Sequence, residues 1–293
     1  MTLATTTAYH PTPAGRLFAL AAGAGRPVIC LHGITANAYV WLPVMERLAT
    51  EFRVVAIDQR GHGRSDRPAG DAYAARDFAA DIAALVDALG GEPAILIGHS
   101  LGARNALAAA VAAPSHVAAV VAIDFVPFIE AAVFEQLSAR VSGGDRRFAT
   151  IAEVEDYLRQ RYPLLPADAV ARRARHGYRR DADDALVPLA DAAAMAATCA
   201  GLRDDLAATL AAVAVPTLLM RGAASRLVSP EAFRRARALR PDLAAIEIAD
   251  ADHYVPEEKP AAVVAAVAGF LGRIPPARRA ETMAMSDGVM ANG

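Results

Sequence analysis

The sequence predicts an α/β fold, in which helices cover both faces of a mostly parallel sheet and a helical cap is inserted. Three observations support this prediction. Short apolar, β-branched runs alternate with longer helical patterns, which is typical of parallel sheets. A Gly-His-Ser-Leu-Gly motif at residues 98–102 lies between an apolar run and an alanine-rich stretch. The alternation then stops between about residues 126 and 206.

The expected strands are six apolar runs, separated by stretches with helical periodicity. Helices are expected over residues 73–89, 103–113 and 260–271. At 293 residues and 55% hydrophobic content, the chain suits one large domain with an insertion or two small domains. The six expected strands lie at residues 28–31, 52–57, 94–97, 117–123, 215–220 and 243–248.

Residues 126–206 interrupt this alternation. They contain no convincing strand, and they combine amphipathic stretches with many arginines and several prolines. We interpret them as a helical cap over the carboxyl ends of the strands, where open α/β folds bind ligands. The core is then expected in residues 1–125 and 207–273. The polar, irregular residues 274–293 are expected to form a disordered tail.

The composition excludes several classes of partner. A net charge of −2 offers no general attraction for nucleic acid or an acidic membrane surface. No apolar run reaches the roughly 18 residues that a membrane-spanning helix needs. Cys30 and Cys199 are too few for a disulfide framework, and the N-terminus has no signal-peptide pattern. We therefore expect a cytoplasmic protein with a small-molecule substrate, and a homodimer is left open.

Ser100 is the expected nucleophile. It is the centre of the G-x-S-x-G motif, with strand-like residues 94–97 before it and helix-like residues 103–110 after it. A serine on such a sharp strand-to-helix turn exposes its hydroxyl, and the flanking glycines let two backbones pass closely. The motif also occurs by chance, but this context predicts the nucleophile elbow of a serine hydrolase.

His253 is the expected general base, because a serine hydroxyl needs a base to become a nucleophile. Its loop follows the late strand at residues 243–248 and precedes the helix expected at residues 260–271. A loop at that edge of the sheet can place an imidazole over the elbow. The order of nucleophile and base along the chain also fits this architecture.

Asp124 is the expected acid that orients the base. The loop after the strand at residues 215–220 is a usual place for this acid, but it holds no carboxylate before Glu231. Asp124 ends the strand that follows the elbow, so it can reach the same imidazole. Asp250 and Asp252 are the alternatives, although their closeness to the base in sequence makes the required hydrogen bond harder.

Two backbone N–H donors are needed for the negative oxygen that develops during attack. Leu101, directly after the nucleophile, is the first expected donor, and Ile34 in the early loop is the second. The segment at residues 58–66 is expected to shape a loop rather than to react. The predicted reaction is hydrolysis through an acyl-enzyme.

These motifs together resemble the α/β-hydrolase superfamily, because His32-Gly33, the loop at residues 60–65, the elbow and His253 occur in its order. Other segments are similar to the family of bacterial (E)-2-(acetamidomethylene)succinate hydrolases of vitamin B6 degradation. The likeness runs from about residue 27 to residue 270 and includes the cap, which sets substrate choice. The segments that carry it are residues 98–105, 122–125, 161–163, 240–243 and 251–255.

The resemblance implies an amidohydrolase that takes its acid from Asp124 and needs no metal or cofactor. It implies a small enamide dicarboxylate as substrate, with release of acetate and breakdown of the remainder to succinic semialdehyde, ammonia and carbon dioxide. It further implies that Arg140, Arg161 and Tyr162 of the cap line the pocket, with Tyr254 beside the base. Arginine suits this role because it binds a carboxylate with two parallel hydrogen bonds.

Other readings of these residues stay open. The arginine pairs at residues 146–147, 172–173 and 179–180 are expected on the solvated surface. The same triad serves carboxylesterases, lactonases and C–C bond hydrolases, and the fold does not choose among them. A ligand-binding protein that keeps this fold, or an interaction protein with an arginine-rich cap, belongs to another class. Haloalkane dehalogenases and soluble epoxide hydrolases fit less well, because they use an aspartate where this chain has Ser100.

Overall fold

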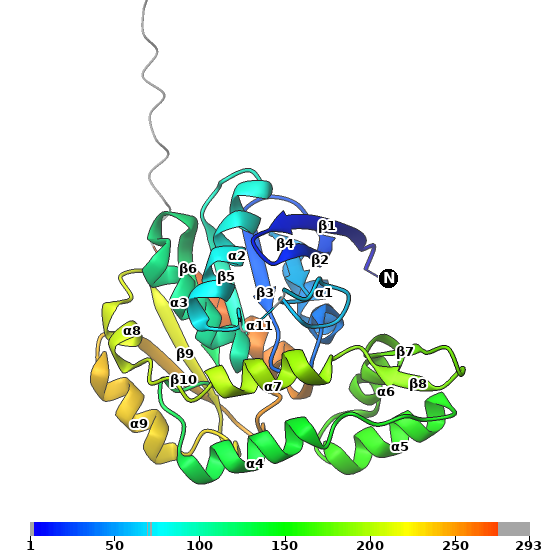
Figure 1. The fold of residues 1–293 in the computed structure, drawn as a ribbon. Helices are drawn as coiled ribbons and strands as arrows, with labels where there is room; N and C mark the ends of the chain where they lie inside the picture. Colours follow the sequence, from blue (N-terminus) through cyan, green and yellow to red (C-terminus); the bar gives the residue numbers. More distant parts are fainter. Residues whose placement is uncertain (1–2, 69, 71, 275–293) are drawn as a thin grey trace, which may run out of the picture.

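The computed structural model describes residues 3–68, 70 and 72–274. Its strands are β1 (Thr6–Thr12), β2 (Gly15–Ala22), β3 (Pro27–Leu31), β4 (Arg53–Ile57), β5 (Ala94–His99), β6 (Val117–Ile123), β9 (Thr217–Gly222) and β10 (Ala244–Ile248). They form an eight-stranded sheet in the order β1-β2-β4-β3-β5-β6-β9-β10 (Figure 1). From β4 to β10 neighbouring strands are parallel, whereas β1 and β2 are antiparallel at one edge.

Helices cover both faces of this sheet. They are α1 (Leu42–Leu48), α2 (Ala75–Ala88), α3 (Leu101–Ala112), α8 (Ala207–Ala212), α9 (Pro230–Leu239) and α11 (Pro260–Leu271). In β3, Ile29 and Leu31 belong to the core cluster that also includes residues of α2, α3, α8 and α9. Val28 and Cys30 alternate with them and belong to the cluster on the other face, which includes residues of α1 and α11. The predicted α/β architecture with a mostly parallel sheet is confirmed.

The six expected strands are all present, and the structure adds β1 and β2. The side chains of β1 are mostly exposed at the edge of the sheet, so this strand has no apolar run that would reveal it in the sequence. The expected helices form as well. Helix α11 spans the expected residues, and α2 and α3 begin and end within two residues of expectation.

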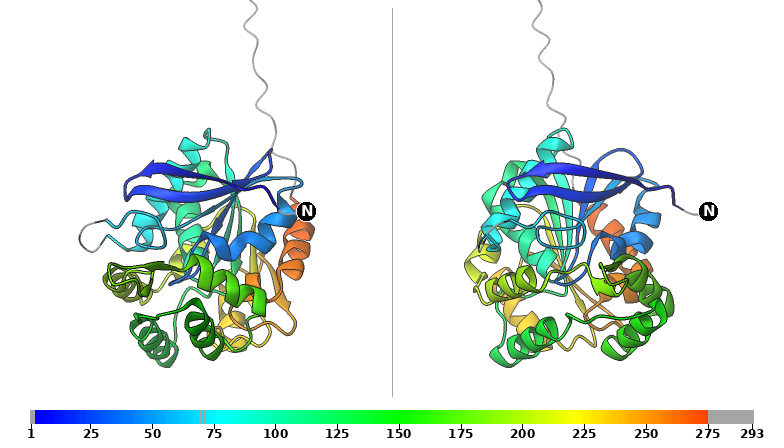
Figure 2. Two further views of the ribbon diagram at one scale, coloured as in Figure 1. Left: turned by 90° about the vertical axis from the view of Figure 1, so that its right-hand side faces the viewer. Right: turned by 45° about the vertical axis from the view of Figure 1, so that its right-hand side comes forward.

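Residues 126–206 form a helical layer with one small hairpin. The elements are α4 (Ala131–Ser142), α5 (Ile151–Arg161), α6 (Ala167–His176), β7 (Tyr178–Arg180), β8 (Leu186–Pro188) and α7 (Ala192–Gly201). Figures 1 and 2 show them gathered at one end of the sheet, away from β1 and β2. The expectation of no strand here is wrong, because β7 and β8 pair antiparallel. Each has three residues, too few to show an apolar alternation.

The cap contacts the core at several points, one of which is His176 at the end of α6. Asn37 Nδ2 donates to the His176 carbonyl at 3.1 Å, and the rings of Tyr39 and His176 stack with 3.7 Å between centroids. The division of core and cap at residues 126 and 206 stays a prediction. The expected tail lies, from residue 275 onward, outside the described residues. Three short helices complete the fold, namely η1 (Ala38–Trp41), η2 (Pro114–His116) and α10 (Val255–Glu258).

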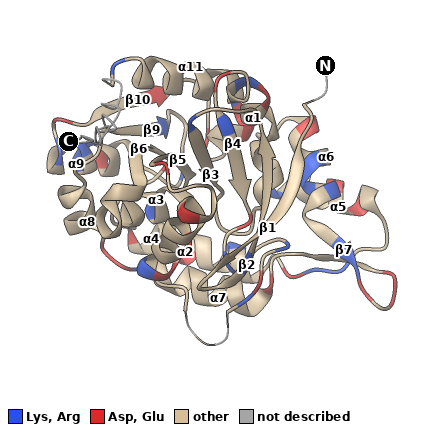
Figure 3. Ribbon diagram, turned by 90° about the horizontal axis from the view of Figure 1, so that it is seen from above, with Lys and Arg blue, Asp and Glu red and all other residues tan. Residues whose placement is uncertain are grey.

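The surface carries mixed charges. Figure 3 shows basic and acidic residues interspersed over the molecule, including the cap. Arg147 pairs with Asp181 at 2.8 Å, and Arg159 pairs with Glu155 at 2.7 Å. Exposed pairs of this kind contribute little to stability. Among the helices of the described residues, none has the length and hydropathy to cross a bilayer.

Buried histidines make the stability of this fold depend on pH. His62 is fully buried, and its Nδ1 lies 2.9 Å from the Arg60 carbonyl oxygen. Burial lowers the pKa of His62 from its ordinary value of 6.5 to about 4. Burial also lowers the pKa of His32 well below 6.5. At these two histidines the unfolded chain binds more protons than the folded protein, so their contribution to the free energy of unfolding decreases as the pH falls from about 6.5 toward 4.

We expect the His62 contribution alone to reduce the free energy of unfolding by about 3 kcal/mol over this range. Urea denaturation at several pH values measures the effect. His62→Asn keeps a donor for the Arg60 carbonyl and should flatten the dependence. The matched change His116→Asn on η2 should not flatten it. If His62→Asn left the pH dependence of the free energy of unfolding unchanged, His62 would not be its source.

Candidate active site

Ser100 forms a strained turn between β5 and α3. Its backbone has φ 52° and ψ −114°, a conformation that a non-glycine residue keeps only when the surrounding structure holds it. The flanking glycines allow this packing. A Cβ atom on Gly98 would lie 2.3 Å from the backbone carbon of Gly102, and one on Gly102 would lie 2.1 Å from the Leu31 carbonyl oxygen. Both glycines of the motif are therefore required for strand, turn and helix to meet.

Asp124 lies directly after β6 and contacts His253. Its Oδ2 accepts a hydrogen bond from His253 Nδ1 at 2.7 Å and another from the Ser225 hydroxyl at 2.6 Å. Its Oδ1 accepts from the Gly222 N–H at 2.8 Å. These donors fix the buried carboxylate. Because a carboxylate only accepts, His253 carries its proton on Nδ1, and Nε2 is left to take a proton from a nucleophile.

The loop at residues 221–229, which lacks an acid, supplies donors to Asp124 instead. The two alternative acids lie elsewhere. Asp252 pairs with Arg226 at 2.6 Å, and Asp250 is exposed at the surface. The structure thus places Asp124, and neither alternative, against the imidazole of His253.

A residue of the elbow also positions His253 by a hydrogen bond. Nε2 of His99, the residue before Ser100, donates to the His253 carbonyl oxygen at 2.7 Å. Burial, together with the neighbouring His253, keeps the pKa of His99 well below its ordinary value, so this ring is neutral. One hydrogen bond therefore joins the strand that carries the nucleophile to the loop that carries the base.

Ile34 and Leu101 both lie beside Ser100. Ile34 lines a cavity with Ser100 and His253, and Leu101 lines a neighbouring cavity with Ser100. Leu101 begins α3, a helix of 12 residues, and helix N-termini favour negative charge. Thr35, next to Ile34, has φ 65°, which marks a tight turn. The placement suits an oxyanion hole, and the role of the two amides stays a prediction.

The four residues expected to bind substrate form one cluster. Arg140 Nη1 donates to the Tyr254 hydroxyl at 3.0 Å, and Arg161 Nε donates to the Tyr162 hydroxyl at 3.0 Å. Arg161 also donates to the carbonyl of Arg140. The two tyrosine rings meet edge to face with 4.9 Å between centroids. The cap arginines are therefore ordered by the tyrosines before any ligand binds.

Three of these side chains reach the nucleophile. Arg140, Arg161 and Tyr254 line, with Ser100 and His253, a cavity that is partly open to solvent. We call it the cationic cavity. Its guanidinium groups can bind carboxylates with paired hydrogen bonds. The arrangement can hold an anionic substrate against a serine nucleophile.

Arg173 is a cavity residue that the sequence analysis placed wrongly. It was expected on the solvated surface, but it is 9% exposed and lines the cationic cavity. Its Nε donates to Glu257 at 3.0 Å, and its guanidinium lies 4.6 Å from the Tyr162 ring and 4.7 Å from the Tyr254 ring. A buried charge of this kind is retained only when it is paired, and Glu257 provides the partner.

A signal for Arg173 was present in the sequence. On helix α6 it shares a face with the buried residues Ala169, Val170 and Ala174, which lie three or four positions away or adjacent. Arg172 is largely buried too, with 11% of its side chain exposed. The pairs at residues 146–147 and 179–180 are exposed, as expected.

The arginines and the burial together determine the charges in this cluster. Burial disfavours the phenolate of Tyr162, but Arg173 and Arg161 outweigh it and lower the pKa of the hydroxyl. Burial raises the pKa of Tyr254. Burial also acts against the charge of Arg173, but Glu257 outweighs it and raises the pKa of the guanidinium. Tyr254 therefore stays protonated, and Arg173 stays charged.

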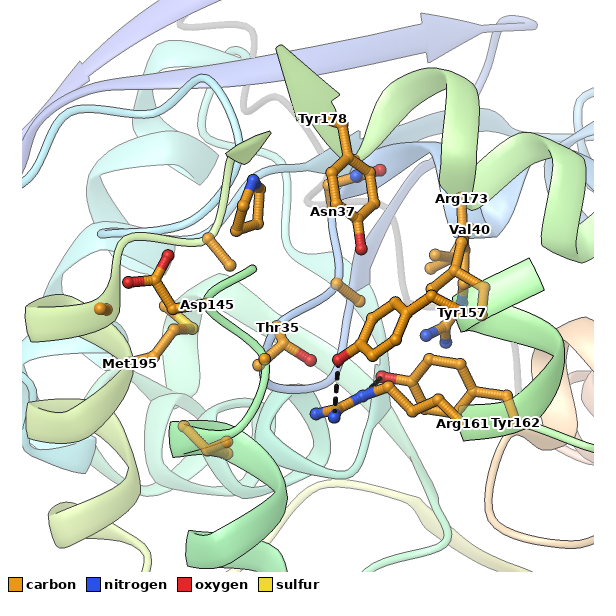
Figure 4. Close-up of a pocket in the computed structure, with 18 residues that line it drawn as sticks. Thr35, Asn37, Val40, Asp145, Tyr157, Arg161, Tyr162, Arg173, Tyr178 and Met195 are labelled. Atoms are coloured by element: carbon orange, nitrogen blue, oxygen red, sulfur yellow. Dashed lines mark hydrogen bonds between the residues drawn. The ribbon is translucent and has the colours of Figure 1, made fainter. Parts of the chain in front are cut away.

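A further cavity adjoins the cationic cavity on the cap side (Figure 4). Arg161 and Arg173 line both cavities, and Tyr162 lines this one. Arg161 Nη1 donates to the Tyr157 hydroxyl at 2.9 Å, and Figure 4 shows the side chains of Tyr157, Arg161 and Tyr162 turned toward one another. The same arginine is thus held from two sides by phenols.

The segment at residues 58–66 has the contacts expected of a loop-shaping motif. Asp58 accepts from the N–H groups of Ala38 at 2.6 Å and Arg64 at 2.7 Å. Arg60 pairs with Asp81 at 2.6 Å, and both side chains are buried. These charged side chains thus connect the loop internally and to η1 and α2. Within the part of the chain that the structure describes, no group of three or more His, Cys, Asp or Glu is placed to hold a metal ion.

Comparison with known proteins gives a consistent result. A family model described as alpha/beta hydrolase fold matches residues 26–260. The 2-(acetamidomethylene)succinate hydrolase of Mesorhizobium japonicum is 47% identical over 249 residues, covering 85% of this chain and 89% of the relative. A crystal structure of E-2-(acetamidomethylene)succinate hydrolase superposes with a TM-score of 0.89 at 44% identity, covering 92% of this chain and all of that one. The thioesterase domain from the curacin biosynthetic pathway, with 22% identity, a TM-score of 0.78 and coverage of 90% and 99%, shares the fold.

Proposed function

The chain belongs to the alpha/beta hydrolase family and is a hydrolase, and from this premise we propose that it cleaves the amide bond of 2-(acetamidomethylene)succinate or a closely related small dicarboxylate. The observation that carries the proposal is the cationic cavity, where Arg140 and Arg161 lie beside Ser100. Two guanidinium groups next to a nucleophile match a substrate with two carboxylates. The similarity to the Mesorhizobium japonicum enzyme supports the same substrate.

In the proposed reaction, Ser100 Oγ attacks the acetyl carbonyl carbon while His253, oriented by Asp124, takes the hydroxyl proton. The amides of Ile34 and Leu101 stabilise the negative oxygen. His253 then gives the proton to the leaving nitrogen, the C–N bond breaks, and the acetyl group stays on Ser100. Water attacks this acetyl-enzyme with His253 as the base, which releases acetate and restores the serine hydroxyl.

We expect Arg140→Ala and Arg161→Ala each to reduce kcat/KM for the acetamidomethylene dicarboxylate about 10- to 100-fold, since a hydrogen bond to a charged group contributes about 1.5–3 kcal/mol. Hydrolysis of a neutral ester, p-nitrophenyl acetate, should change no more than about threefold, because it has no carboxylate to bind. Steady-state kinetics with both substrates measures this difference.

The matched control is Arg147→Ala, which removes an exposed cap arginine paired with Asp181. It should leave both activities near those of the wild type. Equal losses of the two activities in the Arg140 and Arg161 variants would count against carboxylate binding. They would favour the other chemistries of the same triad.

Carboxylesterase, lactonase and C–C bond hydrolase activities are the alternatives within this family. A turnover screen of the acetamidomethylene dicarboxylate beside simple esters and lactones separates them by kcat/KM. A ligand-binding protein with this fold would release no product beyond the first turnover. Multiple turnovers with any of these substrates therefore exclude that class.

We also propose a cytoplasmic location. Cys30 and Cys199 are both free thiols and both lie in buried positions, which suits a reducing compartment. A homodimer is a further proposal, and sedimentation velocity of the purified protein tests it.

A further inference from the structure

A second cavity opens at Ser100, and its character differs from that of the cationic cavity. It shares Ser100 and His253 with the cationic cavity, but its walls contain neither Arg140 nor Arg161. We call it the apolar cavity. It has about 580 Å³ of empty space, part of which is open to solvent. Its apolar lining is Leu101, Phe125, Val126, Pro127, Phe128, Ile129, Val133, Leu137, Leu202, Leu206, Leu227 and Val228.

Apart from Asp124 of the triad, the charged residues that line this cavity pair with each other. Arg104 and Asp204 both line it, and Arg104 Nη2 lies 3.3 Å from Asp204 Oδ2. Arg104 is 1% exposed, and it also donates to the Gly201 carbonyl at 2.7 Å. An anionic group in the apolar cavity would meet Asp204 as well as Arg104. The lining therefore favours a neutral, apolar ligand group.

The two cavities divide a substrate at its scissile bond. A carbonyl carbon attacked by Ser100 carries an acyl group on one side and a leaving group on the other. In the proposed function the carboxylates belong to the leaving group, which needs the arginines of the cationic cavity. The acyl group is then directed to the apolar cavity. An apolar lining of twelve residues is more extensive than the methyl group of an acetyl requires.

We propose that the apolar cavity is an acyl-chain site, and that the enzyme also hydrolyses esters and amides of neutral acyl chains longer than acetyl. The inference rests on the proposed function, because that function assigns the leaving group to the cationic cavity. The bonds made and broken are unchanged. Ser100 Oγ bonds to the acyl carbon, the ester or amide bond breaks with the proton passing through His253 to the leaving atom, and water releases the carboxylic acid.

Chain-length kinetics test this proposal. Each added methylene should raise kcat/KM about fourfold, which corresponds to about 0.8 kcal/mol per buried methylene. We therefore expect kcat/KM of the wild-type protein to rise from p-nitrophenyl acetate through the butyrate to the hexanoate. An alcohol series of ethyl, butyl and hexyl acetate, which lengthens the leaving group instead, should show no such rise.

Val133→Phe is the variant that tests the location of the site. Val133 lies on α4 and lines the apolar cavity but not the cationic one. The larger side chain should reduce kcat/KM for the hexanoate at least about tenfold and leave the acetate within about threefold. Ala132→Phe adds a ring at the preceding, exposed position of the same helix and should change neither. If Val133→Phe does not fold, Val133→Ala provides a second test of the same position. It enlarges the apolar cavity and should shift the preference toward longer acyl chains.

The outcomes separate the two proposals. A wild-type rate that is flat or falls with acyl length, a rise in the alcohol series alone, or an equal effect of Val133→Phe on all chain lengths would overturn the acyl site. If the dicarboxylate is not hydrolysed but the acyl series behaves as expected, the proposed function fails and the acyl site stands. If the dicarboxylate is hydrolysed and the acyl series is flat, the acyl site fails and the proposed function stands.

Discussion

Ser100→Ala is expected to reduce kcat about 10⁴- to 10⁶-fold with every substrate that the wild-type protein hydrolyses. Alanine has no oxygen to form the acyl-enzyme, and the remaining catalysis would come only from binding and the oxyanion hole. The fold should persist, because alanine is smaller than serine and the turn keeps its flanking glycines. Steady-state kinetics and circular dichroism measure the two effects.

Trapping of the acetyl-enzyme tests directly whether Ser100 is the nucleophile. Rapid quenching during turnover of p-nitrophenyl acetate should leave an acetyl group on the wild-type peptide that contains Ser100, and none on the variant. Ser115→Ala, at an exposed serine on η2, is the matched control and should retain full activity. Appreciable residual hydrolysis by Ser100→Ala would contradict the covalent route.

Asp124→Asn is expected to reduce kcat about 10⁴-fold, the loss seen when an asparagine stabilises the wrong imidazole tautomer in a serine triad. Asp124 Oδ2 accepts from His253 Nδ1 at 2.7 Å, whereas an amide group there can present an N–H to the ring. The proton on His253 would then move to Nε2, and the ring could no longer take the proton of Ser100. Kinetics over a range of pH values measures the loss.

Asp252→Asn is the control for this prediction. Asp252 pairs with Arg226 at 2.6 Å. Its replacement should therefore lower the melting temperature and change kcat little. The two variants together test the choice among the acids. If Asp252→Asn or Asp250→Asn abolished turnover while Asp124→Asn did not, the orienting acid would have to be reassigned.

Much of this fold follows from local patterns in the sequence. The alternation of apolar runs and helical periodicity predicts the parallel strands, because a strand buried on both faces must be apolar along its length. The edge strand β1 was not predictable in this way, since its side chains are mostly exposed. The hairpin of β7 and β8 was missed because three residues carry no measurable period.

The contacts between distant residues needed the tertiary structure. Asp124 and His253 are 129 positions apart, and three acids were open to the sequence argument. Arg173 and Glu257 are 84 positions apart, and without the partner an arginine on a helix is most simply assigned to the surface. A buried charge becomes plausible only when its counter-charge is known.

By itself the sequence determined the elbow and therefore the chemistry. Gly98 and Gly102 are required because a Cβ atom at either position would collide with neighbouring backbone, and that requirement is written in a five-residue motif. The tertiary structure brought the expected Arg140 and Arg161 together in a cationic cavity at Ser100, and it alone showed the apolar cavity that Ser100 also lines. The physical reason is that a motif encodes the local path of the backbone, whereas a cavity is made by side chains that only folding brings together.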